Sequence, residues 1–513
     1  MSVFPSPCPS ADAWETRDPE FDPQALWTAE GTLVKKADKR KVIRSGKYFI
    51  KAFRLAPGPA GRLRDPARLE WTISLALAER GLTPKPCAYG RSGRWSYFIA
   101  QKADGLELGQ YINKLQAQPD RRMTRKMAKD FAGFLVDIAS CGVLQPDFHL
   151  GNILFQEPAG HLLLLDLHRA HYRGRPLSQR EFTQQIISVL PPMVENLSSR
   201  NILEACSILS RHVPVLGQRA GRYNLLDKAF ENMRRHWDKK EKRKIYASQR
   251  RKRTRGGLCI SAAIAKEEAV KGLRALVLSP DQYMNDRTLV QQILKDSRHT
   301  LCMKAVFGSR KYFVKAYRSS GNLKAISYLA RKPRSLKTWD MSWRLAYRHI
   351  PVARPVAAFQ TRNPWSRIYG AVLFPWIPEA VTSKQNITDL LHEPASANLF
   401  IKHLAHFVWQ MHQRGVFHGD CKITNFICFP GRKPELVLFD LDSTKILKKM
   451  RDRERIADIA CMCRSLEKLG CIKDSASMFI REYARLHVPW DTCTGKIEGR
   501  IRGIILKKTR ETR

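Results

Sequence analysis

Hydrophobic and polar positions repeat along the chain in two long blocks of similar pattern. A short run of β-branched and aromatic residues covers 48–53 in the first block, and an equivalent run covers 312–317 in the second. Because such residues favour extended backbone, each run predicts a strand, with a lysine in its middle. A helix is predicted after each strand, at 66–80 and at 336–349, and both helices run into proline-rich turns.

Further elements follow in the same order in both blocks. WSYFIAQ (95–101) and IYGAVLF (368–374) predict another pair of strands. An amphipathic helix follows each strand, because apolar residues recur at helical spacing. These residues are Met123, Met127, Phe131, Phe134, Leu135 and Ile138 in the first block, and Leu404, Phe407, Val408 and Met411 in the second. Gly142 and Gly415 come next and predict the C-terminal caps of the two helices.

Direct sequence matches indicate that the blocks are copies of one unit. Three pairs of segments match in the same order and at nearly constant offset: KYFIKAFR (47–54) with KYFVKAYR (311–318), GVLQPDFHLGN (142–152) with GVFHGDCKITN (415–425), and LLLLDLH (162–168) with LVLFDLD (436–442). Chance explains such an ordered series poorly. The sequence therefore predicts a tandem duplication.

Composition narrows the class of partner. The 513 residues include 90 Lys and Arg against 47 Asp and Glu, a formal net charge of +43. An excess of this size predicts an anionic partner, either nucleic acid or an anionic membrane surface. The segment 234–257 between the blocks is dense in Lys and Arg, and we interpret it as a linker or a solvated basic helix. The twelve cysteines are scattered, which favours reduced, mostly buried thiols over metal sites or disulfides.

The chemistry is carried by four residue types that occur in the same order in both blocks. Phosphoryl transfer needs a lysine on a strand to neutralise phosphates, a loop aspartate to accept the proton of the attacking hydroxyl, and an Asn and a second Asp to hold magnesium. The first block offers Lys51, Asp147, Asn152 and Asp166, and the second Lys315, Asp420, Asn425 and Asp440. We therefore predict an α+β chain of two tandem protein-kinase-like domains, each with a small β-rich N-lobe and a mainly helical C-lobe.

The two copies differ in the residues that support these four. The helix after Lys51 carries Glu70, a candidate partner for the lysine, whereas Thr338 stands at the equivalent position, with Asp340 as a candidate substitute. His418 precedes the loop aspartate of the second copy, and the first copy has Gln145 there, which predicts loss of a backbone support. Neither lysine strand follows a Gly-rich phosphate loop, although the basic segment KKADKRK (35–41) can supply charge in its place.

These motifs resemble the bacterial lipopolysaccharide kinase family, which phosphorylates Kdo or heptose of the inner core. The resemblance rests on DFHLGNILF with LLLLDLHRAHYRGRPLSQRE in the first copy. In the second copy it rests on SLKTWDMSWRLAYRHIPVARPVA, GVFHGDCKITNFICF and LVLFDLDSTK. It implies ATP and Mg²⁺ as cofactors and a sugar hydroxyl of the core glycolipid as acceptor. It also implies that Asp147 and Asp420 are catalytic, that Lys51, Glu70 and Lys315 bind the nucleotide, and that Asn152, Asp166, Asn425 and Asp440 hold the metal.

The resulting prediction is an ATP-dependent sugar kinase that works at the cytoplasmic face of the inner membrane. No segment is apolar enough to span a bilayer, and the basic linker is the predicted contact with the anionic surface. Two alternatives stay open: a kinase for a protein or small molecule, and a partly inactive scaffold that binds an anionic surface or RNA. The predicted domains are an N-terminal tail (1–25), kinase-like domain 1 (26–233), a basic linker (234–275), kinase-like domain 2 (276–490) and a basic C-terminal tail (491–513).

Overall fold

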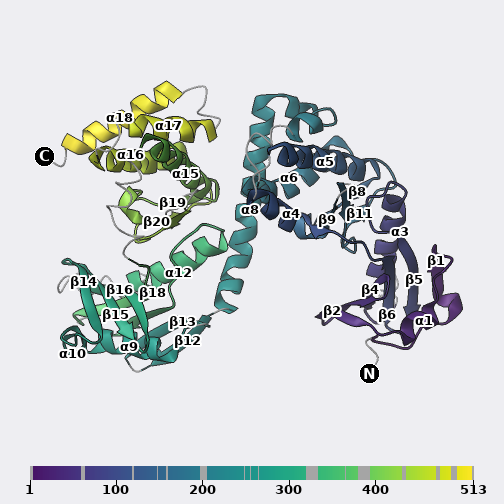
Figure 1. Cartoon of the computed structure of the whole chain (residues 1–513), viewed down its shortest axis with the longest axis horizontal. Coiled ribbons are helices and arrows are strands. Elements are labelled where there is room, and N and C mark those ends of the chain that lie inside the picture. The colour runs from purple at the N-terminus through teal and green to yellow at the C-terminus, as the bar shows by residue number, and fades with distance from the viewer. Residues whose placement is uncertain are drawn as a thin grey trace. The chain divides into compact units, whose positions relative to one another are not determined.

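The chain forms two compact units, Met1–Asn232 and Met233–Arg513, which we refer to as the first and second units (Figure 1). Both mix sheets and helices, in agreement with the predicted α+β class. The computed structural model describes residues 4–58, 64–117, 121–146, 148–157, 160–196, 205–247, 249–254, 256–263, 265–318, 333–363, 366–378, 393–429, 435–469, 474–486 and 494–510.

The first unit begins with a six-stranded antiparallel sheet in the order β1-β5-β6-β4-β3-β2. Its strands are β1 (Trp14–Thr16), β2 (Thr32–Ala37), β3 (Arg40–Ser45), β4 (Tyr48–Arg54), β5 (Pro86–Ser92) and β6 (Trp95–Gln101). Helix α3 (Pro66–Ala78) packs on β5 and β6. The helix starts at Asp65, whose carboxylate accepts hydrogen bonds from two backbone N–H groups of the first turn.

A mainly helical part follows in the first unit. Its elements are β7 (Leu106–Glu107), α4 (Leu108–Ala117), α5 (Arg121–Ser140), β8 (Val143–Leu144), η2 (Leu150–Asn152), β9 (Ile153–Gln156), β10 (His161–Leu164), β11 (His171–Tyr172), α6 (Gln179–Asn196), η3 (Pro214–Gly217) and the start of α8 (Arg219–Ala247). From Met233 onward, α8 belongs to the second unit. The predicted apolar stripe of α5 is buried from Met127 to Ile138, whereas Met123 is exposed. Gly142 follows α5 with φ 73°, and a Cβ there would lie 2.2 Å from the Arg175 carbonyl oxygen, so glycine is required.

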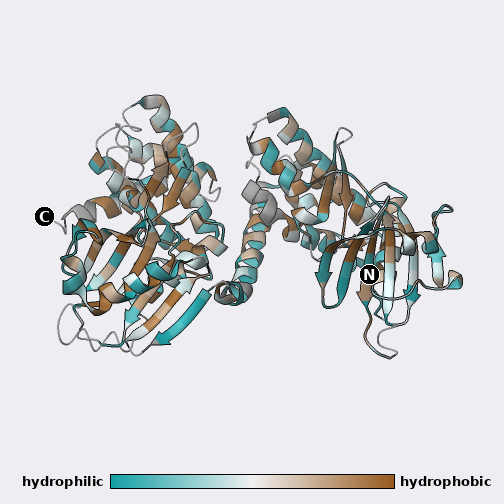
Figure 2. Ribbon diagram, turned by 60° about the horizontal axis from the view of Figure 1, so that its bottom comes forward, coloured by the Kyte–Doolittle hydropathy of each residue, from teal (hydrophilic) through white to brown (hydrophobic). Residues whose placement is uncertain are grey.

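The second unit contains a seven-stranded sheet in the order β12-β13-β17-β18-β16-β15-β14. Its strands are β12 (Gln249–Thr254), β13 (Gly257–Ala262), β14 (Val290–Asp296), β15 (Thr300–Phe307), β16 (Arg310–Arg318), β17 (Ala357–Thr361) and β18 (Ile368–Pro375). Helices α9 (Glu267–Leu278) and α12 (Arg334–Tyr347) both contact β17 and β18, and α10 (Pro280–Met284) contacts α9. Apolar residues therefore line the inner strands, whereas the edge strand β12 is hydrophilic along its length (Figure 2).

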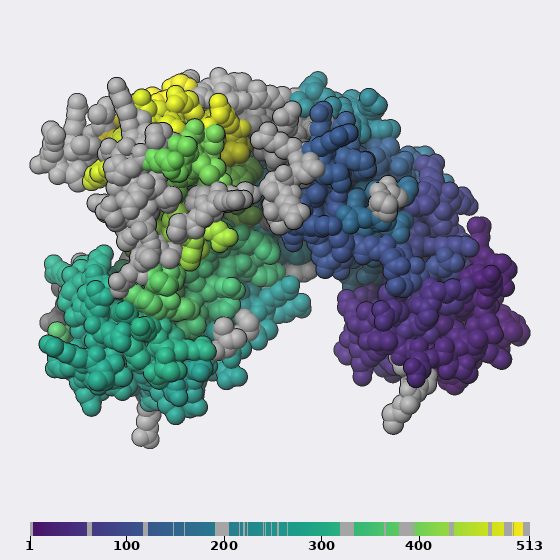
Figure 3. All heavy atoms as spheres, in the orientation of Figure 1, coloured from purple at the N-terminus to yellow at the C-terminus, as the bar shows by residue number. Residues whose placement is uncertain are grey.

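The helical part of the second unit repeats the order found in the first. Its elements are α15 (Pro394–Gln413), β19 (Val416–Phe417), η4 (Ile423–Asn425), β20 (Phe426–Phe429), β21 (Glu435–Leu438), β22 (Lys445–Ile446), α16 (Asp452–Leu469), α17 (Ser475–Leu486) and α18 (Thr494–Arg510). Gly415 ends α15 with φ 77°, as the sequence predicts. Helix α18 packs on α16 and α17, and these C-terminal helices appear as neighbouring yellow spheres (Figure 3).

Three segments interpreted as tails or linker have a defined structure. In the segment predicted to be an N-terminal tail, Trp14–Thr16 form β1, and Phe4 and Phe21 are buried in the core of the first sheet, because their apolar side chains cover a face of that sheet. The C-terminal segment forms α18, with Ile501 buried.

The basic segment 234–257 lies within the second unit and is therefore not a linker, although its first part is helical, as the alternative interpretation predicts. It ends α8 and then supplies β12 and β13 to the sheet of the second unit. Its acidic residues Asp238 and Glu241 make internal ion pairs, as described below, and Arg234 donates a hydrogen bond of 2.8 Å to the Gln413 carbonyl oxygen. Within the described residues, no helix is long and apolar enough to cross a membrane.

Candidate active sites

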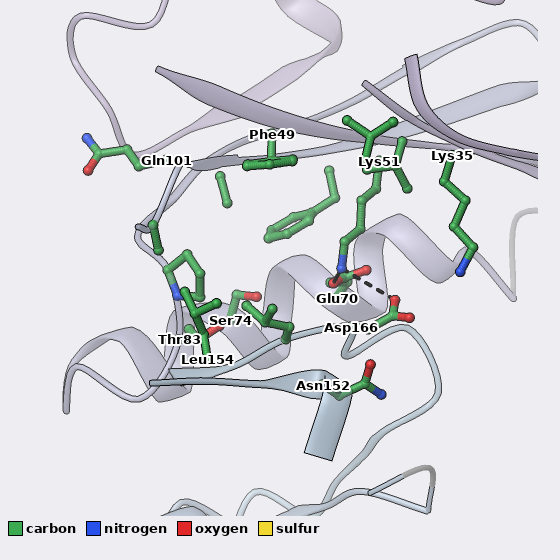
Figure 4. A pocket seen from close by; sticks show the side chains of 18 of the residues that line it. Lys35, Phe49, Lys51, Glu70, Ser74, Thr83, Gln101, Asn152, Leu154 and Asp166 are labelled. Carbon is green, nitrogen blue, oxygen red and sulfur yellow. Dashed lines mark hydrogen bonds and ion pairs between the residues drawn. The ribbon is translucent and has the colours of Figure 1, made fainter. Parts of the chain in front are cut away.

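In the first unit, the ammonium of Lys51 on β4 is paired with a carboxylate from α3. Lys51 Nζ lies 2.5 Å from Glu70 Oε1 and 3.4 Å from Asp166 Oδ1 (Figure 4). Glu70 is buried, and its Oε1 also accepts a hydrogen bond of 3.1 Å from the backbone N–H of Leu167. The predicted Lys51–Glu70 pair is thus present, and Glu70 ties the helix to both the lysine strand and the segment after Asp166.

Asp166 is surrounded by three cationic or protonatable side chains. Its carboxylate accepts hydrogen bonds from Arg40 Nη1 at 2.7 and 3.0 Å and lies 2.7 Å from His168 Nδ1. Burial alone would raise the pKa of Asp166, but the His168 hydrogen bond and the Lys51 charge outweigh it and hold the pKa well below its usual range. The carboxylate is therefore charged and available as a ligand near neutral pH.

An unusual backbone conformation is shared by Asp166 and Asp440, the two aspartates that follow β10 and β21. Asp166 has φ 58° and Asp440 has φ 53°, and these are two of only four described non-glycine residues with positive φ. An L-residue holds this conformation only where the surrounding structure requires it. The shared strain indicates that the two aspartates occupy equivalent places at the ends of equivalent strands.

Asn152 lies in the same pocket as Lys51 and Asp166. It ends the short helix η2 and is largely buried, and in the close-up view its amide lies below Asp166 (Figure 4). Asp147, predicted to be the catalytic base of this copy, lies outside the described residues.

A single cavity of about 390 Å³ joins these polar groups to an apolar region. Lys51, Glu70, Asn152 and Asp166 line its polar end. The rest of the lining includes Val34, Val42, Phe49, Ala100, Gln101, Leu154 and Leu165. The volume falls in the range of small-molecule sites, about 300–1,000 Å³. Lys35 (Figure 4) and Arg40, from the basic segment that stands in place of a Gly-rich loop, also line the cavity, as expected.

The loop of the first unit keeps a backbone support that the sequence predicts to be lost. Gln145 Nε2 donates a hydrogen bond of 3.1 Å to the carbonyl oxygen of Asp166. The backbone N–H of Gln145 donates in turn to Gln185 Oε1 on α6, at 2.9 Å. The prediction is wrong on this point, because the amide of Gln145 makes a backbone hydrogen bond of its own.

In the second unit, Lys315 on β16 is paired with two carboxylates that follow β21. Its Nζ lies 2.7 Å from Asp440 Oδ1 and 3.1 Å from Asp442 Oδ2. Burial would lower the pKa of Lys315, but Asp442 and Asp440 outweigh it and raise the pKa. Asp442, rather than the candidate Asp340, therefore replaces the missing helix glutamate and holds Lys315 in position.

Residues on β16 and α12 hold Asp442 in this place. Arg334 Nη2 lies 2.5 Å from Asp442 Oδ2, and the hydroxyl groups of Tyr317 and Thr338 donate to Oδ1 at 3.0 and 2.9 Å. Burial would raise the pKa of Asp442, but the charges of Lys315 and Arg334 lower it to about 2. Thr338, which the sequence alignment places opposite Glu70, thus acts on the lysine through Asp442.

Asp458, which is not among the predicted site residues, fixes the loop that carries Asp420. Asp458 on α16 is buried, and its carboxylate accepts hydrogen bonds of 2.8 Å from the backbone N–H groups of His418 and Gly419. Its Oδ2 also lies 3.2 Å from His412 Nε2. Asp420 itself contacts Lys422 Nζ at 2.8 Å, and Asn425 Nδ2 donates to the Asp420 carbonyl oxygen at 2.8 Å.

A longer alignment of the two copies contains the signal for this residue. When QREFTQQI (179–186) is aligned with DRERIADI (452–459), Gln185 falls opposite Asp458. Gln145 likewise falls opposite His418. The two copies therefore hold their loops with different pairs, a neutral Gln145–Gln185 pair and a pair that contains the buried Asp458 carboxylate.

The end of α8 clamps α12 in the second unit through a buried charge cluster. Glu241 is 1% exposed; its Oε1 accepts from Arg344 Nε at 2.7 Å, and its Oε2 lies 3.0 Å from Arg348 Nη2. Arg348, with 0% exposure, also contacts Asp238 at 2.5 Å and lies over the ring of Trp237. The acidic side of a basic helix therefore fixes the helix that carries Thr338 and Arg334.

A comparison with known protein families gives a match in the second unit. The family model described as "Lipopolysaccharide kinase (Kdo/WaaP) family" matches residues 293–483, within the second unit. The match confirms the resemblance stated from the motifs and, with it, the predicted enzyme class, an ATP-dependent phosphotransferase.

Other comparisons add little to this match. The solved structure titled "WaaP in complex with acyl carrier protein" is similar, with 22% sequence identity, coverage of 42% of this chain and 97% of that chain, and a TM-score of 0.35. No curated protein matches the chain.

Proposed function

We propose that the chain transfers the γ-phosphoryl group of ATP to a hydroxyl of Kdo or heptose in the lipopolysaccharide inner core, and that transfer takes place in the first unit. The observation that carries this proposal is the single cavity that Lys51, Glu70, Asn152 and Asp166 share with an apolar pocket of nucleotide size. The acceptor class rests on the family match.

The donor set of the first unit fits a hard divalent cation. Oxygen or nitrogen ligand atoms of Glu70, Asp166 and His168 lie within 4.8 Å of one another, and the Asn152 amide lines the same cavity. Carboxylate and amide oxygens are the ligands that Mg²⁺ takes in phosphotransferases. We assign Asp166 and Asn152 to the metal, which when bound neutralises charge on the nucleotide phosphates.

The remaining residues then have separate roles in binding and proton transfer. Lys51, held in place by Glu70, neutralises phosphate charge, and Arg40 and Lys35 add positive charge at the cavity. Phe49 and the aliphatic lining exclude water from the nucleotide base. By its sequence position, Asp147 accepts the proton of the attacking sugar hydroxyl. Lys315, Asp420, Asn425 and Asp440 stand at the equivalent positions of the second copy.

We also propose that the protein meets its acceptor at the anionic inner-membrane surface. The edge strand β12 presents four exposed basic residues in succession, Arg250, Arg251, Lys252 and Arg253. Exposed Arg243 and Lys244 of α8 precede them in the chain. Each basic residue near an anionic surface contributes about 1 kcal/mol, so such a group suffices for reversible docking.

Label transfer from γ-labelled ATP and Mg²⁺ tests the activity. Purified chain is incubated separately with dephosphorylated core glycolipid, casein and RNA, and Lys51→Met serves as the matched inactive variant. We expect label in the glycolipid, dependent on Lys51. Label in casein, or retention of RNA without glycolipid labelling, would overturn the proposal. Sedimentation with anionic and neutral vesicles tests docking, and equal binding to both would exclude the electrostatic contact.

A further inference from the structure

The nucleotide sites of the two units differ at two positions that the strand register makes equivalent. Lys51 pairs with Phe98 across β4 and β6, and Lys315 pairs with Val372 across β16 and β18. Two residues towards the N-terminus on each lysine strand, Phe49 pairs with Ala100 and Phe313 pairs with Phe374. The second unit therefore has phenylalanine where the first has alanine.

The second difference lies directly before the aspartate at the end of the next strand. Leu165 precedes Asp166 in the first unit, whereas Phe439 precedes Asp440 in the second. Both Ala100 and Leu165 line the 390 Å³ cavity of the first unit. Two small or aliphatic lining residues are thus replaced by aromatic rings at the same point of the second site.

In the second unit, Phe313, Phe374 and Phe439 form one aromatic cluster. Their ring centroids are separated by 6.1 Å for Phe313–Phe374, 5.1 Å for Phe313–Phe439 and 5.8 Å for Phe374–Phe439. These distances are typical of mutually stabilising aromatic contacts. Phe374 is only 5% exposed. The cluster is therefore a packed element of the fold rather than three independent surface rings.

The cluster divides the space that is continuous in the first unit. A cavity of about 430 Å³ lies on one side, lined by the three phenylalanines, Trp376 and Phe426 among others. On the other side, the cavity that described residues form around Lys315 and Asp440 has a volume of about 10 Å³. Phe374 and Phe439 line both. The space at Lys315 holds about one water molecule, far less than a triphosphate needs.

The charges around Lys315 are consistent with a closed site. Its side chain is 6% exposed, against 18% for Lys51, and two carboxylates accept its charge. A phosphate that approached Lys315 would have to displace these contacts as well as the rings. Because Lys51 also contacts two carboxylates, Glu70 and Asp166, the lower exposure and the steric closure distinguish the second site.

We propose that Phe374 and Phe439 form a plug that keeps nucleotide phosphates away from Lys315, so that the second unit does not bind ATP as the first unit does. The proposal deepens the proposed function, on which it rests for the choice of ATP as probe. The test uses the residues of the first unit, because Ala100 and Leu165 line an open cavity at the two equivalent positions.

Binding stoichiometry of the non-hydrolysable analogue AMP-PNP with Mg²⁺, measured by isothermal titration calorimetry on the full chain, tests the plug. An opened variant, Phe374→Ala with Phe439→Leu, copies the first unit into the second. We expect it to bind one more AMP-PNP per chain than the wild type, and the addition of Lys315→Met to remove that gain. The reverse variant, Ala100→Phe with Leu165→Phe, is expected to bind one fewer.

The outcomes separate the plug from the proposed function. A folded opened variant without additional binding would overturn the plug, and so would a wild type that loses one bound AMP-PNP through Lys315→Met. A wild type that binds none would overturn nucleotide binding in the first unit, while a gain in the opened variant would still support the plug. Circular dichroism checks folding, and the milder Phe374→Leu with Phe439→Leu replaces an opened variant that does not fold.

Discussion

The lysines of the two units hold the same place on equivalent strands, yet their surroundings differ in kind. Lys51 is held by a glutamate on a helix and faces an open cavity. Lys315 is held by Asp440 and Asp442, both on the segment after β21, and faces aromatic rings. Identical motif residues can therefore carry different functions, because the residues around them decide whether a ligand can reach them.

The largest expected difference between the units concerns phosphoryl transfer. Lys51→Met should lower the initial rate of glycolipid labelling on the order of 10²–10³-fold, the size of losing one preorganised charge-stabilising group in an active site. Lys315→Met should lower it by less than about three-fold, because a closed site contributes no such group. The rates are measured at saturating ATP, and the reverse ranking of the two variants would assign transfer to the second unit.

The clamp between α8 and α12 gives the next largest effect, and it is confined to the second unit. Glu241→Gln leaves Arg348 buried with a weakened partner and should cost about 3 kcal/mol, as for other broken buried ion pairs. Hydrogen exchange of α12 amides, followed by mass spectrometry, measures the loss. The control is Glu467→Gln on α16, because Glu467 is exposed and the substitution removes the same charge as Glu241→Gln. Equal protection of α12 in both variants would contradict the clamp.

Acid pH should weaken the second site through Asp442. Its pKa in the folded chain is about 2, against an ordinary value of about 3.9. Because the folded pKa is depressed, the stabilisation is fully present above about pH 4 and is lost as the pH falls towards 2. The difference in unfolding free energy between wild type and Asp442→Asn, about 2 kcal/mol at pH 6, should therefore shrink by pH 3. A difference that stays constant with pH would rule out this role.

The residues that support the two loops, Gln185 and Asp458, give a further expected difference in stability between the units. Gln185→Ala removes one hydrogen bond to the Gln145 N–H and should cost about 1 kcal/mol. Asp458→Ala removes a charged acceptor from two backbone N–H groups and should cost about 3 kcal/mol. Local hydrogen exchange of the two loops measures both values. Equal costs would show that the neutral pair holds its loop as firmly as the carboxylate does.

Much of the architecture can be predicted from the sequence. The lysine strands, the helices after them and the strands at 95–101 and 368–374 occur where the pattern predicts them, because hydrophobic periodicity depends on local backbone geometry. Gly142 and Gly415 end their helices as expected. The repeat also predicts which residues of the two units correspond, and the shared positive φ of Asp166 and Asp440 agrees with that correspondence.

Tertiary structure alone decided how each site is completed. Asp442 replaces the glutamate that α12 lacks, Gln145 supplies a support that seemed lost, and Phe374 and Phe439 divide a cavity that is continuous in the first unit. The sequence by itself determined the element order, and it predicts the duplication and the four polar residues of each copy, because these follow from local pattern and spacing. Which carboxylate reaches which lysine, and whether a cavity remains beside it, depends on side chains brought together from distant segments.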